Sequence, residues 1–277
     1  MQWASLEDTR ALEEECTWAD RDVPVTLYEM LTRTRDNFGA RPAISYQLTS
    51  GPKDKAETLS WNELHQKTTQ TANMFRALGV GPDDVVAYIL PNATETVLSV
   101  LGGAVAGIVN PINPLLDADQ IAAILRETNA KVVVTLKAFP KTDIPQKAAE
   151  AVAAAPNVKA VVEVDLLRYL TFPKSVIVPL IRPKNPVSHH AKIYDFNALM
   201  GQQNTTLDFE DVREDRVAAY FHTGGTTGMP KVAQHTYSGM IYNGWLGDTL
   251  LFTEEDAVIC PLPLFHVFAV HVILMAM

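Results

Sequence analysis

The sequence predicts an α/β fold, with mostly parallel β-sheets covered by helices. Helical and strand patterns alternate from residue 60 to residue 165, which is typical of parallel sheets with crossover helices. The strand predicted at residues 85–90 is a continuous apolar run, and the strand predicted at 131–136 contains three consecutive valines, as expected for strands buried on both faces. Hydrophobic residues make up 47% of the chain and charged residues 20%, which provides ample material for a core.

The first helix of this alternating region is predicted to begin just after Ser60. Ser60 and Glu63 have the S-x-x-E spacing of a capping box. The side chains expected to face the core then recur at spacings of three and four, as on one face of a helix. They are Leu64, Thr68, Thr71, Phe75 and Leu78. Gly79 is expected to end the helix.

Short apolar runs and cap residues predict the elements that follow. Residues 85–90 form a strand, and Asn92 is expected to cap a helix that runs to about Gly107. Residues 108–114 then turn back as a short strand and a loop. The remaining elements are a helix from Asp117, with Gln120 in the reach-back position, to about Asn129, a strand at 131–136, a helix at 146–155 and a strand at 158–164.

The alternation breaks at residues 166–186, which contain four prolines, four basic residues and no acidic residue. The prolines exclude one continuous helix through the whole segment. We expect an irregular surface excursion. The alternative is a basic, apolar patch that contacts a membrane or a partner, because such patches attract anionic lipid. His189 and His190 follow, and neighbours in sequence rarely point at one metal ion.

Charge and cysteine content exclude several classes of protein. The formal net charge is −9, which argues against a nucleic-acid partner. Cys16 and Cys260 form no spaced pattern, so we expect a reducing compartment without disulfides or a thiolate metal site. The acidic N-terminus has no apolar h-region of a signal peptide. We therefore expect a cytoplasmic protein.

The last 21 residues carry no Asp, Glu, Lys or Arg. Two prolines and two histidines, which are costly in a lipid-facing helix, argue against a membrane span. We expect a strand, a turn and the start of a core helix instead. Because this end has no polar cap, we expect the chain to be the front part of a longer protein.

The stretch FHTGGTTGMPK, residues 221–231, places three glycines and three threonines within six positions. Residues 216–221 are predicted to enter it as a strand, residues 231–236 to leave it as a strand, and residues 237–252 to form a helix. A Walker loop requires Gly-Lys-Ser/Thr followed at once by a helix. Here Pro230 precedes Lys231 and Val232 follows it, so the Walker pattern fails.

This loop has the chemistry to bind phosphate. Glycines allow successive backbone N–H groups to converge on one anion, threonine hydroxyls add donors, and Lys231 adds a positive charge. The alternative is a mobile hairpin loop without a ligand. The candidate phosphate-binding residues are Thr223, Gly224, Gly225, Thr226, Thr227, Gly228 and Lys231.

The same stretch resembles the phosphate-loop signature of the adenylate-forming superfamily, [T/S]-[S/G]-G-[S/T]-T-G-x-P-K. All its defined positions are filled between Thr223 and Lys231. Residues 58–116 resemble the superfamily's N-terminal region. PLPLFH, residues 261–266, resembles its P-L-F-H segment beside the acyl pocket, although Ala269 stands where a glycine is frequent. The resemblance runs from about Val23 to the end of the chain.

This resemblance implies the large N-terminal domain of an acyl-CoA synthetase, incomplete at its C-terminus, over residues 1–277. Residues 60–165 would form an alternating subdomain, and residues 216–277 the phosphate-loop hairpin and the start of the acyl-pocket region. His266 would lie in the acyl pocket, and the catalytic residues are expected beyond Met277. No residue set predicts a bound structural metal.

The activity implied by the resemblance is activation of a carboxylic acid, expected to be a fatty acid. Mg²⁺-bound ATP would give an acyl-adenylate, and coenzyme A would accept the acyl group. The chain alone is expected to be inactive and to bind ATP weakly. Three alternatives remain: an adenylation domain or other acid–thiol ligase of the superfamily, a nucleotide-binding module without catalysis, and a kinase or NTPase.

Overall fold

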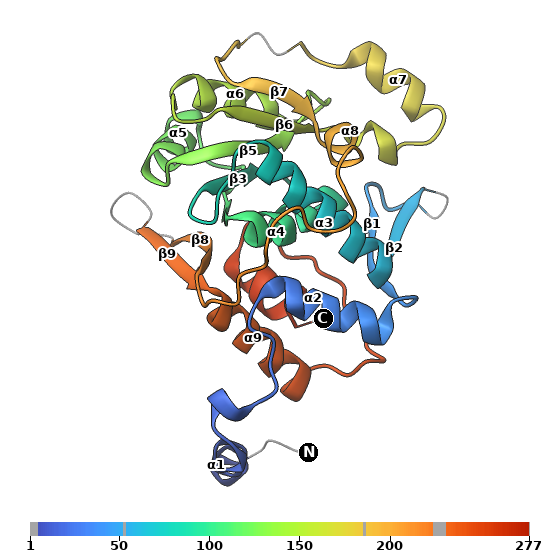
Figure 1. The fold of residues 1–277 in the computed structure, drawn as a ribbon. Helices are drawn as coiled ribbons and strands as arrows, with labels where there is room; N and C mark the ends of the chain where they lie inside the picture. Colours follow the sequence, from blue (N-terminus) through green and yellow to red (C-terminus); the bar gives the residue numbers. More distant parts are fainter. Residues whose placement is uncertain (1–4, 52–53, 185–186, 224–230, 277) are drawn as a thin grey trace.

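The computed structural model describes residues 5–51, 54–184, 187–223 and 231–276. At its centre lies a seven-stranded sheet in the order β7-β6-β5-β3-β4-β8-β9 (Figure 1). Neighbouring strands are parallel except for β8 and β9, which are antiparallel. The predicted mostly parallel α/β fold is therefore confirmed. The strands are β3 (Val85–Ile89), β4 (Ile108–Pro111), β5 (Ala130–Leu136), β6 (Ala160–Val164), β7 (Lys192–Asp195), β8 (Val217–Thr223) and β9 (Lys231–Thr236).

Helices cover both faces of this sheet, as expected. On one face pack α3 (Trp61–Ala77) and α4 (Thr94–Ala106), and on the other α5 (Ala118–Glu127) and α6 (Ile144–Ala153) (Figure 1). Successive side chains of β3 alternate between the two cores: Tyr88 belongs to the first and Ala87 to the second. This alternation follows from the two-residue period of a strand.

The N-terminal part adds a small antiparallel sheet and further helices. Its elements are α1 (Leu6–Glu15), η1 (Trp18–Asp20), α2 (Leu27–Phe38), β1 (Pro42–Gln47) and β2 (Ala56–Ser60), with β1 paired to β2. The capping boxes predicted at Ser60 and Asp117 are both present. Gly79, with a φ of +86°, follows α3 as predicted. These local signals agree with the structure because both partners lie within three or four residues of each other.

The cap predicted at Asn92 is wrong. Residue Ala93 occupies the N-cap of α4 and makes no side-chain cap hydrogen bond. The side chain of Asn92 instead reaches residues 262–264, where its amide donates to the carbonyl of Leu262 and its carbonyl accepts from the N–H of Leu264. A long-range contact has therefore replaced the local one.

The segment after β6, which its four prolines led us to expect to be irregular, contains short helices. It forms η2 (Leu166–Tyr169), α7 (Lys174–Ile181), then β7 and α8 (Phe196–Met200). The helix α7 continues through Pro179, although proline cannot donate the hydrogen bond to the carbonyl four residues earlier. Because α7 is short and has no fully buried residue, water can solvate that carbonyl.

The C-terminal part begins with α9 (Tyr237–Leu250), as predicted, and ends with η3 (Ala269–Leu274), a π-helix. The strand expected near residue 258 does not form, and residues 257–261 are irregular. A strand requires a neighbour to satisfy its backbone groups, and none of the described strands pairs with this segment. No helix within the described ranges is both long and apolar enough to cross a bilayer.

Candidate nucleotide-binding site

The strands predicted on either side of the phosphate loop, and the helix predicted after them, are confirmed. Strand β8 ends at Thr223 and β9 begins at Lys231, and these two residues are paired across the antiparallel ladder. Because β8 runs parallel to β4, the mouth of this hairpin lies at the carboxyl edge of the sheet, where open α/β sheets bind ligands. Lys231 is exposed at this mouth.

Several predicted phosphate-binding residues lie outside the described residues. They are Gly224, Gly225, Thr226, Thr227 and Gly228, and the proline of the motif, Pro230, lies there too. The structure therefore places the two ends of the motif, Thr223 and Lys231, and the strands that carry them.

A polar network that the sequence did not predict supports one face of the hairpin. His222 Nε2 donates to Asn110 Oδ1 at 3.0 Å, and the amide of Asn110 donates to Thr128 Oγ1 at 3.2 Å. The other ring nitrogen of His222 is buried and has no hydrogen-bond partner. Burial lowers the pKa of His222, so a neutral ring sits one residue before Thr223. The only sequence signal for the position of His222 was the two-residue period of β8, which places His222 and Phe221 on opposite faces of the strand.

An aromatic cluster supports the opposite face of the hairpin. The ring centroid of Phe221 lies 5.1 Å from that of His235 and 5.6 Å from that of His271, and the two imidazoles are 4.7 Å apart. Burial, followed by the neighbouring His235, lowers the pKa of His271 to about 4. These neutral rings join β8 and β9 to η3, so the loop motif and the C-terminal segment meet in space.

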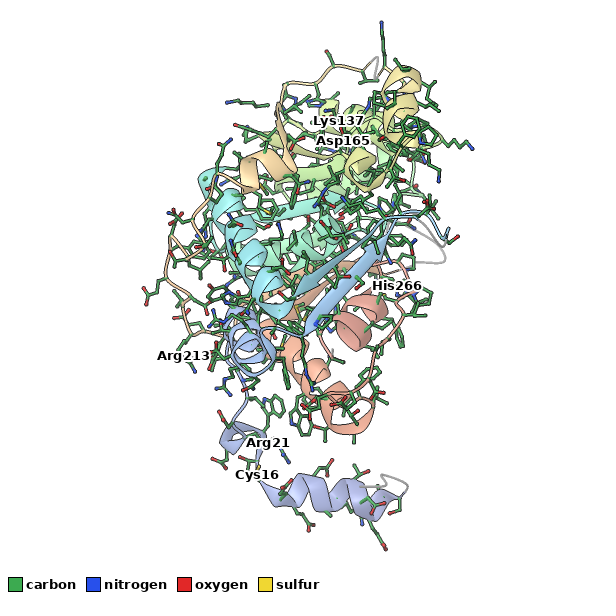
Figure 2. All side chains as sticks on the ribbon, turned by 90° about the vertical axis from the view of Figure 1, so that its right-hand side faces the viewer. Cys16, Arg21, Lys137, Asp165, Arg213 and His266 are labelled. Carbon is green, nitrogen blue, oxygen red and sulfur yellow. The ribbon has the colours of Figure 1, made fainter. Side chains whose placement is uncertain are left out.

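The segment at residues 261–266 is held against the carboxyl end of β3. The buried hydroxyl of Tyr88 donates to the carbonyl of Leu264. Next to it, Asn92 donates to the carbonyl of Leu262 at 2.9 Å and accepts from the N–H of Leu264 at 2.8 Å. Sequence reasoning missed both residues, because their partners lie about 170 positions away. His266 is exposed (Figure 2). Its backbone N–H donates to the carbonyl of Pro263.

A cavity of about 580 Å³ lies beside this segment. It is lined by β1, the start of α4 and residues 256–260, together with Leu264, Ile273 and Leu274. His266 is not among the lining residues. Cys260 is, and burial raises the pKa of its thiol. The lining is mainly apolar, so the cavity suits an uncharged, hydrophobic group.

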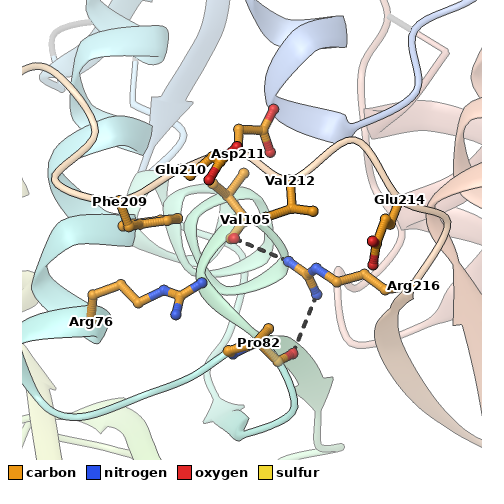
Figure 3. A pocket seen from close by; sticks show the side chains of 9 residues that line it. All are labelled: Arg76, Pro82, Val105, Phe209, Glu210, Asp211, Val212, Glu214 and Arg216. Atoms are coloured by element: carbon orange, nitrogen blue, oxygen red, sulfur yellow. Dashed lines mark hydrogen bonds between the residues drawn. The ribbon is translucent and has the colours of Figure 1, made fainter.

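A second cavity, of about 320 Å³, lies at the amino edge of the sheet (Figure 3). Arg216, which directly precedes β8, donates there to the carbonyls of Ala104 and Gly107, each at 2.7 Å, and to the hydroxyl of Tyr237 at 2.5 Å. These bonds satisfy carbonyls at the end of α4. Arg216 therefore fixes the base of the hairpin, far along β8 from the loop.

Metal ligands were not predicted in this chain, apart from magnesium carried by ATP. Within the described ranges, no three His, Cys, Asp or Glu side chains gather into a group that could hold an ion. His189 and His190 are adjacent, and His190 Nε2 donates to the carbonyl of Val158 at 2.9 Å. That contact joins the residues before β7 to the residues before β6.

A family model described as AMP-binding enzyme matches residues 31–277. The chain is 32% identical over 238 residues to a marinolic acid–CoA ligase of Pseudoalteromonas sp. (strain SANK 73390), covering 82% of this chain and 33% of that protein. It is 28% identical to a long-chain-fatty-acid–CoA ligase of Bacillus subtilis (strain 168), covering 88% and 42%. It is 26% identical to 4-coumarate–CoA ligase 1 of Arabidopsis thaliana, covering 91% and 41%.

Two solved structures share the fold. The anthranilate CoA ligase AuaEII, in complex with anthranoyl-AMP, superposes with a TM-score of 0.60 at 18% identity over 84% of this chain. An acetoacetyl-CoA synthetase from Streptomyces lividans gives 0.61 at 22% identity over 79%. The chain spans 38% and 31% of these two proteins, and between 33% and 42% of the three relatives above.

Proposed function

Because the chain belongs to the family of AMP-binding enzymes, we propose that it forms the phosphate-binding part of an acid–CoA ligase. The observation that carries this proposal is the hairpin. Its register sets Thr223 opposite Lys231 at the carboxyl edge of the sheet, and the residues between them fill the family's phosphate-loop motif. Backbone N–H groups, threonine hydroxyls and one lysine would then converge on the β- and γ-phosphates of ATP.

In the proposed reaction, a carboxylate oxygen of the acid attacks the α-phosphorus of ATP. The bond to the β-phosphate oxygen breaks, giving an acyl-adenylate and pyrophosphate. The thiol of coenzyme A then attacks the acyl carbon, losing its proton and displacing AMP. Mg²⁺ bound to the phosphates would neutralise part of their charge. The hairpin contributes by orienting the phosphates and stabilising the charge on departing pyrophosphate.

We propose an apolar acid, such as a fatty acid, as the substrate. The proposal draws on the mainly apolar cavity of about 580 Å³ beside residues 261–266, which is the stretch that resembles the family's acyl-pocket segment. His266 would act at the mouth of the acyl pocket, from its exposed position after Leu264. A carrier-protein thiol in place of coenzyme A is the alternative acceptor.

A cytoplasmic location fits this function, since ATP and coenzyme A are available there. Both Cys16 and Cys260 are free thiols, which a reducing compartment would maintain. We propose that the chain by itself binds Mg-ATP weakly, with a dissociation constant of about 1 mM or more, which corresponds to a binding free energy of about 4 kcal/mol or less. Phosphate contacts at an exposed hairpin are screened by salt and individually weak.

The experiment is a product analysis of the intact protein with Mg-ATP, coenzyme A and a panel of fatty and aromatic acids. We expect acid-dependent release of AMP and pyrophosphate, and acid-dependent exchange of labelled pyrophosphate into ATP. Release of ADP would instead indicate a kinase or NTPase. Nucleotide binding without any exchange, across the whole panel, would indicate a module without catalysis.

A further inference from the structure

The helix α7 and the residues just before it expose an apolar face. Five large apolar side chains are solvent-exposed there: Phe172 at 82%, Val176 at 56%, Ile177 at 47%, Leu180 at 81% and Ile181 at 59%. The last four recur at i, i+1, i+4 and i+5, which is one side of a helix. Single exposed apolar residues are common on proteins, but a contiguous set of this kind marks a contact surface.

Ion pairs at both ends of α7 keep its apolar face turned toward solvent. At its C-terminal end, Arg182 donates to both carboxylate oxygens of Asp165, at 2.8 and 3.0 Å. Lys137 lies 3.4 Å from the same carboxylate (Figure 2). At the other end, Lys174 lies 3.7 Å from Asp54. Ser175 is half-buried on the inner side. Rotation of the apolar face toward the sheet would break these ion pairs.

A network before α7 fixes its approach to the sheet. Arg168, in η2, pairs with Glu57 and with Glu95, which is fully buried. Tyr169 donates to Glu95 at 2.7 Å, and Asn197 donates to the same carboxylate at 2.9 Å. The segment that leads into α7 is therefore anchored by Glu95, a fully buried carboxylate.

The exposed positive charge at this face comes from lysines at the two ends of α7, because Arg168 and Arg182 are paired with carboxylates. Residues 166–184 contain four basic side chains and no acidic one. Lys174 and Lys184 are exposed at the two ends of α7. An apolar strip with lysines at its ends is complementary to a bilayer surface that contains anionic lipids.

We propose that α7 docks this protein on the surface of an anionic lipid bilayer. Eight residues of helix span about 12 Å, whereas a bilayer core is about 30 Å thick, so α7 would lie in the interface and would not cross it. Figure 1 shows α7 on the outside of the molecule, beyond β6 and β7, while the β8–β9 hairpin lies at the other end of the sheet. Docking would leave the hairpin free, and it does not depend on the proposed ligase activity.

The test is co-sedimentation of the chain with vesicles at low salt, using phosphatidylcholine alone or with phosphatidylserine added. The variant Leu180→Gln removes one apolar side chain from α7. Leu115→Gln is the matched control, because both leucines are 81% exposed and neither change affects the core. We expect binding to the anionic vesicles, weakened about tenfold by Leu180→Gln and unchanged by Leu115→Gln.

Three results would overturn the proposal. One is no binding to anionic vesicles at low salt. A second is an equal loss of binding in the two variants. The third is a doubled mass in light scattering that Leu180→Gln abolishes in the absence of vesicle binding, because the face would then be a contact between two copies of the chain.

Discussion

The two ends of the sheet are held to the rest of the molecule by different interactions. At the β6–β7 end, ion pairs between side chains of separate segments hold α7 and the η2 turn before it, as in Arg182 with Asp165 and Arg168 with Glu95. At the β8–β9 end, Arg216 binds main-chain carbonyls of α4. The first arrangement pairs two replaceable side chains. In the second arrangement, one side chain donates to main-chain carbonyls, which no substitution can remove.

Because of this difference, we expect the two ends to respond differently to substitutions. Removing one member of an ion pair leaves a buried charge, which a second substitution can neutralise. Removing an arginine from carbonyl acceptors leaves those acceptors buried and unpaired. We therefore expect the β6–β7 end to be rescuable by a compensating substitution, and the β8–β9 end to be more sensitive.

The largest expected effect is that of Arg216→Met. Arg216 donates to the carbonyls of Ala104, Val105 and Gly107 and to the hydroxyl of Tyr237. Methionine retains the apolar packing but leaves the carbonyls of Val105 and Gly107 without this donor, whereas Ala104 keeps the hydroxyl of Tyr237. We expect the free energy of unfolding to fall by about 3–5 kcal/mol, measured by urea denaturation.

Arg213→Met is the matched control for that experiment. Arg213 is 60% exposed and makes one ion pair, with Glu29 at 2.7 Å. Surface pairs of this kind contribute about 1 kcal/mol or less. Equal losses from Arg213→Met and Arg216→Met would contradict the role given to the carbonyl acceptors.

A smaller loss is expected from Arg168→Met at the other end of the sheet. The variant leaves the fully buried carboxylate of Glu95 without its arginine, which costs about 3 kcal/mol. Adding Glu95→Gln removes the stranded charge. We expect the double variant to recover at least about 1 kcal/mol in a double-mutant cycle. Additive losses would show that the two ends do not differ in this way.

The pH dependence also separates the two ends. The pKa of His271 is lowered to about 4 by burial, against about 6.5 in an unfolded chain. Between these values the unfolded chain binds more protons, so the free energy of unfolding falls as pH falls through this window. The loss by pH 5 should be about 2 kcal/mol.

The carboxyl of Asp165, at the β6–β7 end, titrates in a lower window. Burial raises its pKa, but the hydrogen bond from Arg182 and the other interactions outweigh burial, so the pKa lies below its usual value. Its contribution is present above about pH 4 and is lost below that. His189, just before β7, also has a pKa lowered by burial, so we compare β9 with β6 itself and expect acidification from pH 7 to pH 5 to loosen β9 first.

Hydrogen exchange resolved along the chain is the measurement for that order. The variant His271→Leu should flatten the change in β9, whereas His266→Leu, at an exposed ring, should not. His65 also has a pKa lowered to about 4, by burial and by Arg35, and it lies on α3. Local exchange is therefore a better readout than global melting. Faster exchange in β6 than in β9 at pH 5 would contradict this account.

The parts of the fold that the sequence predicts depend on neighbours in the chain. The capping boxes at Ser60 and Asp117 and the apolar strands could be predicted because the signal lies within a few residues. The cap at Asn92 failed because its side chain is engaged by residues 262–264. The strand expected near residue 258 failed because strand formation depends on a partner elsewhere.

The candidate site follows the same rule. Lys231 and Thr223 stand in one continuous motif, so the hairpin that carries them could be predicted. His222, Tyr88 and Arg216 could not, because each takes its role from a partner more than 100 residues away. The residue pattern of a single strand shows which face of the sheet a side chain lies on, but not which residues it contacts there.

We propose that the motif at residues 223–231 binds the phosphates of ATP. The most direct test is pyrophosphate exchange by the intact protein carrying Lys231→Ala. Lys192→Ala is the matched control, because each lysine is the exposed first residue of an edge strand. A lost charge-assisted hydrogen bond costs about 1.5–3 kcal/mol, so we expect Lys231→Ala to slow exchange about tenfold to a hundredfold. Lys192→Ala should leave the rate unchanged. An unchanged rate in a folded Lys231→Ala variant would contradict the claim.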